Sequence, residues 1–291
     1  MYLLAIDGGG SKTLARLSNP ENGQQWQAAG GPAQLSNDLE LALTNVQLLS
    51  LQVCQKAGIS PQQVVACIGL AGAGNPQLHQ TFCQQLPLEF AGWQLTTDAR
   101  TSLYGANNGQ PVVMLALGTG SVAMRLCADG SEQQTGGWGF TIGDEGGGAW
   151  LGKLAVRQLL WQLDSDNGLS SPLTRALASH CGDNVATILP WLKQATATDY
   201  AALAPLIFQH SSCPLAQQLL HQQADAIAEL VFSCRGQRDL PVVMLGGLAA
   251  NSMPLLSPAV SKLLQPPRGD ALDGGLILAA QQRAQLAGVT G

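Results

Sequence analysis

Two short glycine-containing segments carry residues that could bind phosphate oxygens. The first reads I-D-G-G-G-S-K-T over residues 6–13, and the second reads G-T-G-S over residues 118–121. Glycine-rich turns leave backbone amides open to anions, and Ser, Thr and Lys side chains add further donors. The residues expected to bind the phosphate chain of a nucleotide are Gly9, Gly10, Ser11, Lys12, Thr13, Gly118, Thr119, Gly120 and Ser121.

The first segment matches neither of the two common phosphate motifs. A Walker loop needs G-x-x-x-x-G-K-[ST] between a strand and a helix, and a dinucleotide fingerprint also leads into a helix. Here the alternation in residues 14–17 predicts a returning strand, so the glycines join two antiparallel strands. In such a hairpin Asp7 is placed to hold a magnesium ion through water. For each segment the alternative is an ordinary glycine-rich hairpin without a ligand.

The surrounding pattern predicts a β-β-β-α-β-α-β lobe around the first segment. Asn37 or Asp38 could cap the first helix and Gly58 could end it, while Asn75 and Pro76 open the second. The last short strand ends at Asp98. The expected elements are strands at 3–6, 14–17, 25–28, 64–70 and 95–97, with helices at about 39–57 and from 75 onward.

The opening pattern recurs after the polar stretch 107–111, which is the best linker candidate. A strand at 112–117 leads into the second glycine segment, and a strand at 122–126 returns. This repetition favours a duplicated architecture in which two such hairpins grip a triphosphate chain from both sides. The remaining expected elements are a mostly helical region at 149–232, a strand at 241–245 and a terminal helix at about 270–287.

Length and composition limit the class of protein. A chain of 291 residues exceeds the usual size of one hydrophobic core, which predicts two lobes. The net charge of −5 and the absence of Lys/Arg runs argue against nucleic acid as a partner. No apolar run approaches the roughly 18 residues of a membrane span, and the chain enters a strand directly, so we expect a cytoplasmic protein without a membrane partner.

The cysteines argue against two further kinds of site. There are seven, at positions 54, 67, 83, 127, 181, 213 and 234, with no C-x-x-C pair. An odd number without paired spacing is atypical of a zinc site or a disulfide framework. We therefore expect buried thiols.

The order of the motifs resembles the N-acetylglucosamine kinase family. This family, of the eukaryotic type and related to bacterial glucosamine kinase, belongs to the actin-like ATPase and sugar kinase superfamily. The resemblance spans nearly the whole chain. It rests on I-D-G-G-G-S-K-T, T-T-D-A, L-A-L-G-T-G-S, G-W-G-F-T-I-G-D-E-G-G-G-A-W-L-G, V-V-M-L-G-G-L-A-A-N-S and A-L-D-G-G-L-I-L-A-A, in that order.

The resemblance implies an α/β, two-lobed actin-like ATPase (ribonuclease-H-like) fold with a central cleft. The N-terminal lobe would comprise residues 1–110 joined by a terminal helix from about 276 to 291, and the C-terminal lobe residues 111–275. The implied activity is transfer of the γ-phosphoryl group of ATP, with Mg²⁺, to the 6-hydroxyl of an amino sugar. Trp138-Gly139 favours N-acetylglucosamine over glucosamine, although the acetyl pocket cannot be located from one sequence. A homodimer is also implied.

The resemblance also implies roles for single residues. Asp98 matches the catalytic base, and Gly246 and Gly247 match the adenosine-binding segment. The positions that match sugar contacts are Asn37, Thr119, Trp138, Gly139 and Asp144. A structural alternative for Asp98 is the N-cap of a following helix.

The stretch 136–148 holds seven glycines in thirteen positions, too many for a helix or a central strand. It predicts a shaped loop in which Asp144 and Glu145 accept hydrogen bonds from sugar hydroxyls. Its structural alternative is a loop in which Glu145 caps a helix that begins near Ala149.

Two other functions stay open at this point. One is a dehydratase-activator-type ATPase, which would need paired cysteines for an iron–sulfur cluster. The dispersed cysteines provide no obvious pair. The other is a sugar-sensing regulator without catalytic activity, although the sequence leaves no room for a DNA-binding helix pair before Asp7.

Overall fold

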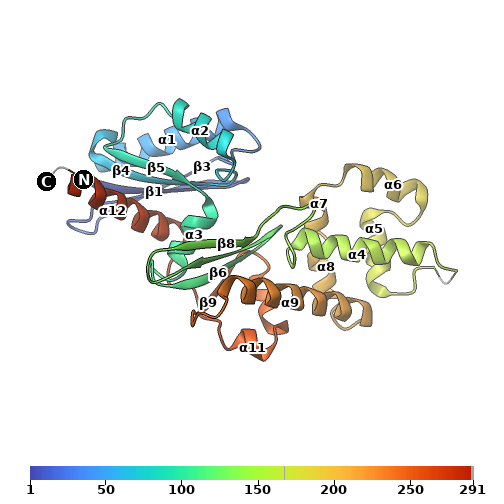
Figure 1. Cartoon of the computed structure of the whole chain (residues 1–291). Helices are drawn as coiled ribbons and strands as arrows, with labels where there is room; N and C mark the ends of the chain where they lie inside the picture. Colours follow the sequence, from blue (N-terminus) through green and yellow to red (C-terminus); the bar gives the residue numbers. More distant parts are fainter. Residues whose placement is uncertain (167, 290–291) are drawn as a thin grey trace. The chain divides into compact units, whose positions relative to one another are not determined.

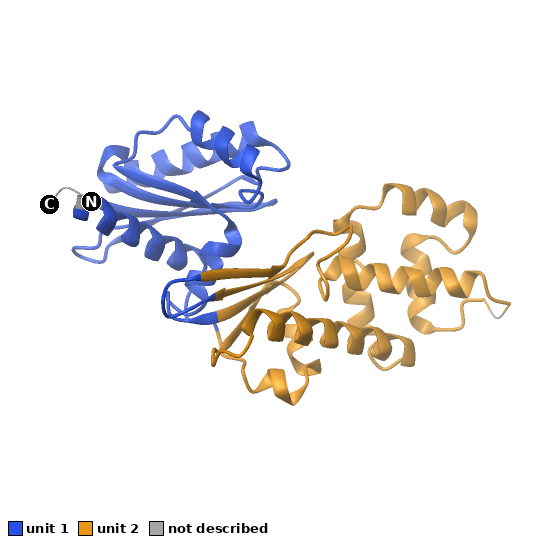
Figure 2. Ribbon diagram, in the orientation of Figure 1, with its two compact units in different colours: residues 1–112, 126–131, 267–291 blue, residues 113–125, 132–266 orange. Residues whose placement is uncertain are grey.

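The chain forms two compact units in a computed structural model that describes residues 1–166 and 168–289 (Figure 1). Unit 1 comprises Met1–Val112, Leu126–Ser131 and Pro267–Gly291, and unit 2 comprises Val113–Arg125 and Glu132–Pro266 (Figure 2). Residues 290 and 291, the end of the terminal helix expected over 276–291, lie outside the described residues.

Unit 1 is built on a five-stranded sheet in the order β3-β2-β1-β4-β5. The first three strands are antiparallel neighbours, whereas β4 runs parallel to both β1 and β5. Every residue of β4 is buried, as expected for a central parallel strand with both faces covered. The strands are β1 Tyr2–Gly8, β2 Thr13–Ser18, β3 Gln25–Gly30, β4 Val64–Leu70 and β5 Gly92–Thr96.

Helices cover both faces of this sheet (Figure 1). Helices α1 and α2 lie over one face, with the short η1 turn before β4, and α3 and α12 lie over the other. Asp38 caps α1 by accepting from the Leu41 amide, and Gly58 ends it at a φ of 69°. These elements are α1 Leu39–Ala57, η1 Pro61–Gln63, α2 Pro76–Gln85, α3 Asp98–Ala106 and α12 Ala271–Val289.

Glycines allow α3 and α12 to pack with their backbones in contact. A Cβ added to Gly105 would lie 1.9 Å from the Asp270 carbonyl oxygen, and one added to Gly274 would lie 1.9 Å from the Thr101 carbonyl oxygen. The start of α12 is also fixed to β2, because Arg16 forms ion pairs with Asp270 at 2.8 Å and Asp273 at 2.6 Å. The terminal helix therefore supports the helix that begins at Asp98.

Unit 2 contains a four-stranded sheet in the order β8-β7-β6-β9, with β6 and β9 parallel. The sequence pattern did not predict β8, because most of its residues are polar. In the structure these residues are exposed or only partly buried. The strands are β6 Val112–Leu117, β7 Ser121–Leu126, β8 Glu132–Gly136 and β9 Val242–Leu245.

Two hydrophobic cores lie side by side in unit 2, one among helices and one on the sheet. Helix α9 contributes to both: Ala216, Leu219 and Leu220 pack in the helical core, and the residues from Ala224 onward pack on the sheet. The helices are α4 Gly148–Leu163, α5 Pro172–Cys181, α6 Val185–Gln194, α7 Ala197–Ala201, α8 Ala204–Gln209, α9 Pro214–Arg235, α10 Ala249–Ser252, η2 Met253–Leu255 and α11 Pro258–Ser261.

All seven cysteines are free, and five are buried. Cys83 and Cys127 are partly exposed, so the expectation of buried thiols is wrong for these two. Among the described helices, none combines the length and the hydropathy that a membrane crossing requires.

Candidate functional site

In unit 1 the predicted site residues gather at one edge of the sheet. Because β1, β4 and β5 are parallel, the segments that follow them leave from the same edge. Backbone hydrogen bonds connect these segments: the Ala71 amide donates to the Gly8 carbonyl at 2.9 Å, and the Ala33 amide donates to the Gly9 carbonyl at 3.0 Å. The turn between β1 and β2 is thus fixed to both neighbouring loops.

A pocket of about 260 Å³ at this edge contains both acidic residues singled out from the sequence. Asp7 comes from the end of β1, and Asp98 is the first residue of α3. Within the described part of the chain, the amides of Gly10 and Ser11 donate to no protein acceptor, so they are available to an anion. The pocket is lined by Asp7, Gly9, Ser11, Lys12, Leu14, Asp98 and Ser102.

The charge of Asp7 is destabilised by its surroundings. The pKa of Asp7 is raised to about 6: burial is the largest cause, the negative charges of Asp98 and Asp270 also raise it, and Lys12 lowers it. A divalent cation beside Asp7 would relieve this repulsion, and carboxylate oxygens are ligands that Mg²⁺ prefers. The described residues contain no group of three His, Cys, Asp or Glu around one metal position. Mg²⁺ usually takes only one or two carboxylates together with water and phosphate, so Asp7 fits such an ion.

Asp98 is not the N-cap of α3, so the structural alternative for this residue is wrong. Thr97 is the cap, and its hydroxyl accepts a hydrogen bond from the Arg100 amide at 3.1 Å. The Asp98 carboxylate accepts from the neighbouring Ala99 amide at 2.9 Å. Burial raises the pKa of Asp98, while the backbone hydrogen bonds lower it. A carboxylate with increased proton affinity in a pocket is suited to accept a proton.

Three other residues predicted in unit 1 do not line this pocket. Thr13 is fully buried, and its hydroxyl donates to the Gly31 carbonyl at 2.7 Å. Gly10 approaches Gln34, whose Oε1 would lie 2.8 Å from an added Cβ. Asn37 is exposed and donates to the same Gln34 oxygen at 3.3 Å. The Asn37 side chain is therefore connected to the first glycine segment through Gln34.

The sequence reasoning did not identify Ser102 or Gln34. Ser102 stands four residues after Asp98, and side chains at this spacing lie on the same face of a helix. That spacing was a usable signal. Gln34 has no comparable signal, because its position depends on the path of the segment that follows β3.

In unit 2 the second glycine segment and the glycine-rich loop 136–148 form one hydrogen-bonded structure. The segment 118–121 is the turn between β6 and β7. The Gly148 amide donates to the Gly118 carbonyl at 2.8 Å, and the Ala149 amide donates to the Thr119 carbonyl at 2.9 Å. The Ser121 hydroxyl donates to the Glu145 carbonyl at 2.7 Å. The predicted phosphate and sugar residues of unit 2 are therefore brought together.

Asp144 lies at the centre of this structure. Its backbone has a φ of 61°, which is uncommon for a residue other than glycine. Its carboxylate accepts from the Gly139 amide at 3.1 Å and from the backbone of Ser121. Burial is the largest influence on this group and raises the pKa of Asp144. A Cβ added to Gly120 would lie 2.3 Å from Asp144 Oδ2, so the close approach requires glycine there.

The middle of the loop is exposed at Trp138 and anchored at Phe140. The Trp138 side chain is 81% exposed. Phe140 packs between Lys153, whose ammonium lies 4.4 Å from the ring centroid, and Tyr200, with ring centroids 5.3 Å apart. Helix α4 has Gly147 as its N-cap without a side-chain hydrogen bond, so the structural alternative in which Glu145 caps this helix is wrong.

The predicted adenosine segment lies beside the end of β6. Because β6 and β9 are parallel, Gly246 follows β9 at the edge where the second glycine segment follows β6. The Leu248 amide donates to the Leu117 carbonyl at 3.1 Å. Gly246 has a φ of 99° and lies against Leu117, whereas a Cβ on Gly247 would meet nothing within 4 Å. Gly247 therefore leaves open space for a ligand.

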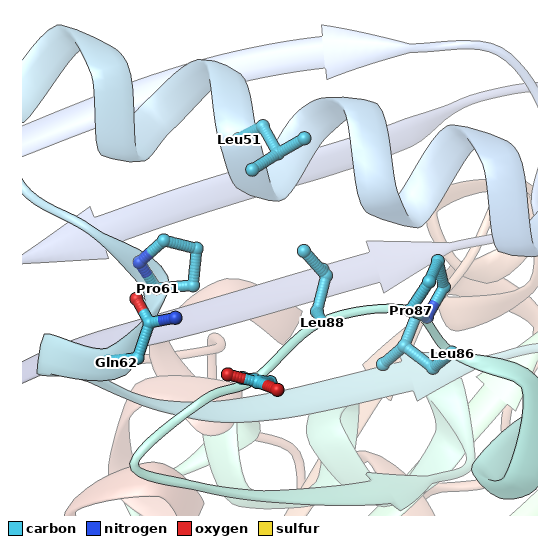
Figure 3. Close-up of a pocket in the computed structure, with 7 residues that line it drawn as sticks. Leu51, Pro61, Gln62, Leu86, Pro87 and Leu88 are labelled. Atoms are coloured by element: carbon cyan, nitrogen blue, oxygen red, sulfur yellow. The ribbon is translucent and has the colours of Figure 1, made fainter.

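Another hollow in unit 1 lies away from these residues (Figure 3). Its lining comes from α1 and from the segments that precede β4 and β5, at the opposite edge of the sheet from Asp98. Glu89 is its one ionisable lining residue. It is lined by Leu51, Pro61, Gln62, Leu86, Pro87, Leu88 and Glu89.

Comparisons with known proteins agree with this arrangement. The family described as the BadF/BadG/BcrA/BcrD ATPase family matches residues 4–265. A glucosamine kinase from Vibrio cholerae is 31% identical over 98% of both chains, and an N-acetyl-D-glucosamine kinase from Dictyostelium discoideum is 24% identical over 84% of both. A crystal structure assigned as an N-acetylglucosamine kinase from Chromobacterium violaceum has a TM-score of 0.85 and 36% identity, over 96% of this chain and 98% of the other.

These matches confirm the resemblance found in the sequence and the actin-like ATPase fold class. The roles of the individual site residues stay predictions.

Proposed function

Because the chain belongs to the BadF/BadG/BcrA/BcrD ATPase family, we propose that it is an ATP-dependent kinase that phosphorylates the 6-hydroxyl of an amino sugar, N-acetylglucosamine or glucosamine. The glucosamine kinase of Vibrio cholerae and the N-acetylglucosamine kinase assignment in Chromobacterium violaceum support this substrate class. The observation that carries the proposal is the pocket shared by Asp7, Lys12 and Asp98, next to the amides of Gly10 and Ser11, which donate to no acceptor among the residues that the structure describes.

Asp98 is proposed to accept the proton of the sugar hydroxyl. An alcohol is a weak nucleophile, and removal of its proton as the bond to phosphorus forms makes attack easier. The raised pKa of Asp98 increases its affinity for that proton. As the hydroxyl oxygen bonds to the γ-phosphorus, the bond between that phosphorus and the bridging oxygen of ATP breaks. The electron pair stays on the bridging oxygen, so ADP leaves with one additional negative charge on its β-phosphate, and the proton held by Asp98 passes to solvent.

Asp7 and Lys12 are proposed to handle the charge of the phosphate chain. Asp7 would hold Mg²⁺ through water, and the ion when bound would neutralise charge on the phosphate oxygens. Lys12 adds a positive charge in the same pocket, and the amides of Gly10 and Ser11 donate hydrogen bonds without needing to rearrange. Thr13 is fully buried and its hydroxyl is bound to Gly31, so we propose that it supports the first glycine segment and does not contact the phosphates.

Unit 2 is proposed to supply the remaining contacts. In the turn 118–121 the amides of Thr119 and Gly120 would donate to the phosphates. The Gly118 amide donates to the Gly120 carbonyl and the Ser121 amide to Asp144, so these two residues would shape the turn. Gly246 and Gly247 would accommodate adenosine. Asp144 and the exposed Trp138 are on one loop, where a carboxylate and an aromatic face could contact a sugar. Asn37 in unit 1 and Thr119 are the other proposed sugar contacts.

A coupled assay of ADP release with different sugars tests this proposal. Glucosamine, N-acetylglucosamine, N-acetylmannosamine and glucose are compared at fixed ATP and Mg²⁺. We expect one of the first two to give the largest kcat/KM. Binding of a sugar without any sugar-dependent ADP release would contradict the kinase and favour a sugar-sensing regulator.

A further inference from the structure

One polar side chain interrupts the apolar face of α9. The buried residues of this helix are apolar except Gln223, which is fully buried where the helical core gives way to the sheet core. Burial of an amide costs free energy unless its hydrogen bonds are made. A leucine at this position would continue the apolar core, so the contacts of the Gln223 amide indicate why a polar residue is present.

Gln223 contacts the glycine-rich loop. Its Nε2 donates to the Gly146 carbonyl at 2.8 Å. Gly146 has a φ of 80°, and an added Cβ would lie 3.0 Å from the Ile227 side chain, so the loop backbone rests directly on α9. Among the described residues, Gln223 Oε1 has no hydrogen-bond partner. Only half of the amide is satisfied, and the satisfied half is the one that fixes the loop.

Gly146 lies between the proposed sugar-binding and phosphate-binding parts of the loop. Two residues earlier is Asp144, whose carbonyl accepts from the Gly147 amide at 3.0 Å. Two and three residues later come Gly148 and Ala149, whose amides donate to the turn 118–121. A shift of the Gly146 carbonyl would therefore change the orientation of Asp144, whereas the turn 118–121 keeps its own hydrogen bond from the Gly118 amide to the Gly120 carbonyl at 2.9 Å.

We infer that Gln223 is a positioning residue for sugar phosphorylation: it fixes Gly146 so that Asp144 is oriented for the acceptor sugar. The inference rests on the proposed kinase function. Gln223 itself lies in the core of unit 2 and acts only through the loop.

Kinetics of Gln223→Met test the inference. Methionine has a similar length and fills the core, but it cannot donate to Gly146. We expect the KM for the sugar to rise about tenfold, in line with the loss of one hydrogen bond of about 1.4 kcal/mol, and the KM for ATP to stay within threefold. Gln222→Met, at the exposed neighbouring position of α9, is the matched control and should behave as wild type. A sugar KM within twofold of wild type would overturn the inference.

A second variant and a second measurement separate positioning from folding. Gln223→Asn keeps the amide but is too short to reach Gly146, and it should raise the sugar KM in the same direction. An equal rise in the KM for ATP and in the KM for the sugar, together with a large fall in Tm in both variants, would assign Gln223 a purely structural role.

Amide hydrogen exchange without ligand separates failure of the inference from failure of the proposed function. Exchange at Gly147, Gly148 and Ala149 should be faster in Gln223→Met than in Gln222→Met, whether or not the chain phosphorylates a sugar. Unchanged exchange at these three amides would contradict the positioning role.

Discussion

The two acidic residues of the unit 1 pocket, Asp7 and Asp98, come from elements far apart in the chain, and the charge of Asp98 makes ionisation of Asp7 less favourable. The Asp7 carboxylate loses solvation by burial, and Asp98 adds a like charge. Such pairs are rarely favourable for stability and are common where a cation or a proton is handled. We therefore propose that Asp7 holds the cation and that Asp98 accepts the proton, and each role leads to a separate prediction.

Replacement of Asp98 should affect turnover much more than binding. In Asp98→Asn the amide cannot accept the hydroxyl proton, and we expect kcat to fall about 10²–10⁴-fold or more. The KM for the sugar should stay within about tenfold, because the substitution preserves size and position. Steady-state kinetics with the preferred sugar provide the measurement. A near-normal kcat would remove Asp98 as the base.

Replacement of Asp7 should stabilise the protein when no metal is present. The pKa of Asp7 is raised to about 6 in the folded chain, so its charged form opposes folding. This cost begins as pH rises past the unfolded value of 3.8 and is complete above pH 6. At pH 7.5 in EDTA, Asp7→Asn should unfold with a free energy about 2–3 kcal/mol higher than wild type.

At pH 4.5 most of this advantage should disappear, because Asp7 is then protonated in the folded chain. Gln24→Ala, which changes no charge in an exposed turn, is the control and should alter the free energy of unfolding equally at both pH values. Denaturant titrations at the two pH values measure the differences. An Asn variant that is less stable than wild type at pH 7.5 would contradict the described burial of Asp7.

Some residues of the site could be predicted from the sequence, and some contacts could not. Asp7 was identified because it follows a recognisable strand pattern, whereas the role of Asp98 came from the family resemblance. The burial of Thr13 was predictable in principle, since Thr13, Ala15 and Leu17 alternate inward along β2. The contact between Gln223 and Gly146 was not predictable, because it joins residues 77 positions apart and no local pattern encodes it.

At the scale of elements, local signals predicted the structure well where they were strong. The bounds of α1 follow from Asp38 and Gly58, and β4 is a continuous apolar run. β8 was missed because its polar residues carry no strand pattern, and tertiary pairing with β7 determines it instead. The close packing of α12 on α3 was not predicted. Gly274 makes this packing possible, but the residues it lies against are in α3, far away in the sequence.

The packing of α12 on α3 leads to a prediction about stability. In Gly274→Ala the new methyl group would lie 1.9 Å from the Thr101 carbonyl oxygen and 2.5 Å from the Gly105 amide. Backbone atoms cannot move aside cheaply, so we expect a loss of about 1–3 kcal/mol in the free energy of unfolding. Gly288→Ala in the same helix meets nothing within 4 Å and should be neutral or stabilising. Thermal unfolding of both variants measures the contrast, and equal Tm values would refute the described packing.

At the scale of the whole molecule, the proposed roles are divided between the two units. Unit 1 contains the proposed base, the proposed cation ligand and the first glycine segment, and unit 2 contains the second glycine segment, the glycine-rich loop and Gly246-Gly247. The order of these motifs along the chain was sufficient to indicate the family. The sugar itself was not, because specificity depends on the shape of a loop that one sequence does not define.

Identification of the product is the most direct test of the proposed transfer of the γ-phosphoryl group from ATP to the sugar 6-hydroxyl. The protein is incubated with ATP, Mg²⁺ and glucosamine or N-acetylglucosamine, and phosphorus NMR follows the phosphate-containing products. We expect one molecule of sugar 6-phosphate for each ADP formed by the wild type, and no sugar 6-phosphate with Asp98→Asn on the same timescale. Release of ADP with free phosphate and no phosphorylated sugar, or no consumption of ATP with either sugar, would contradict it.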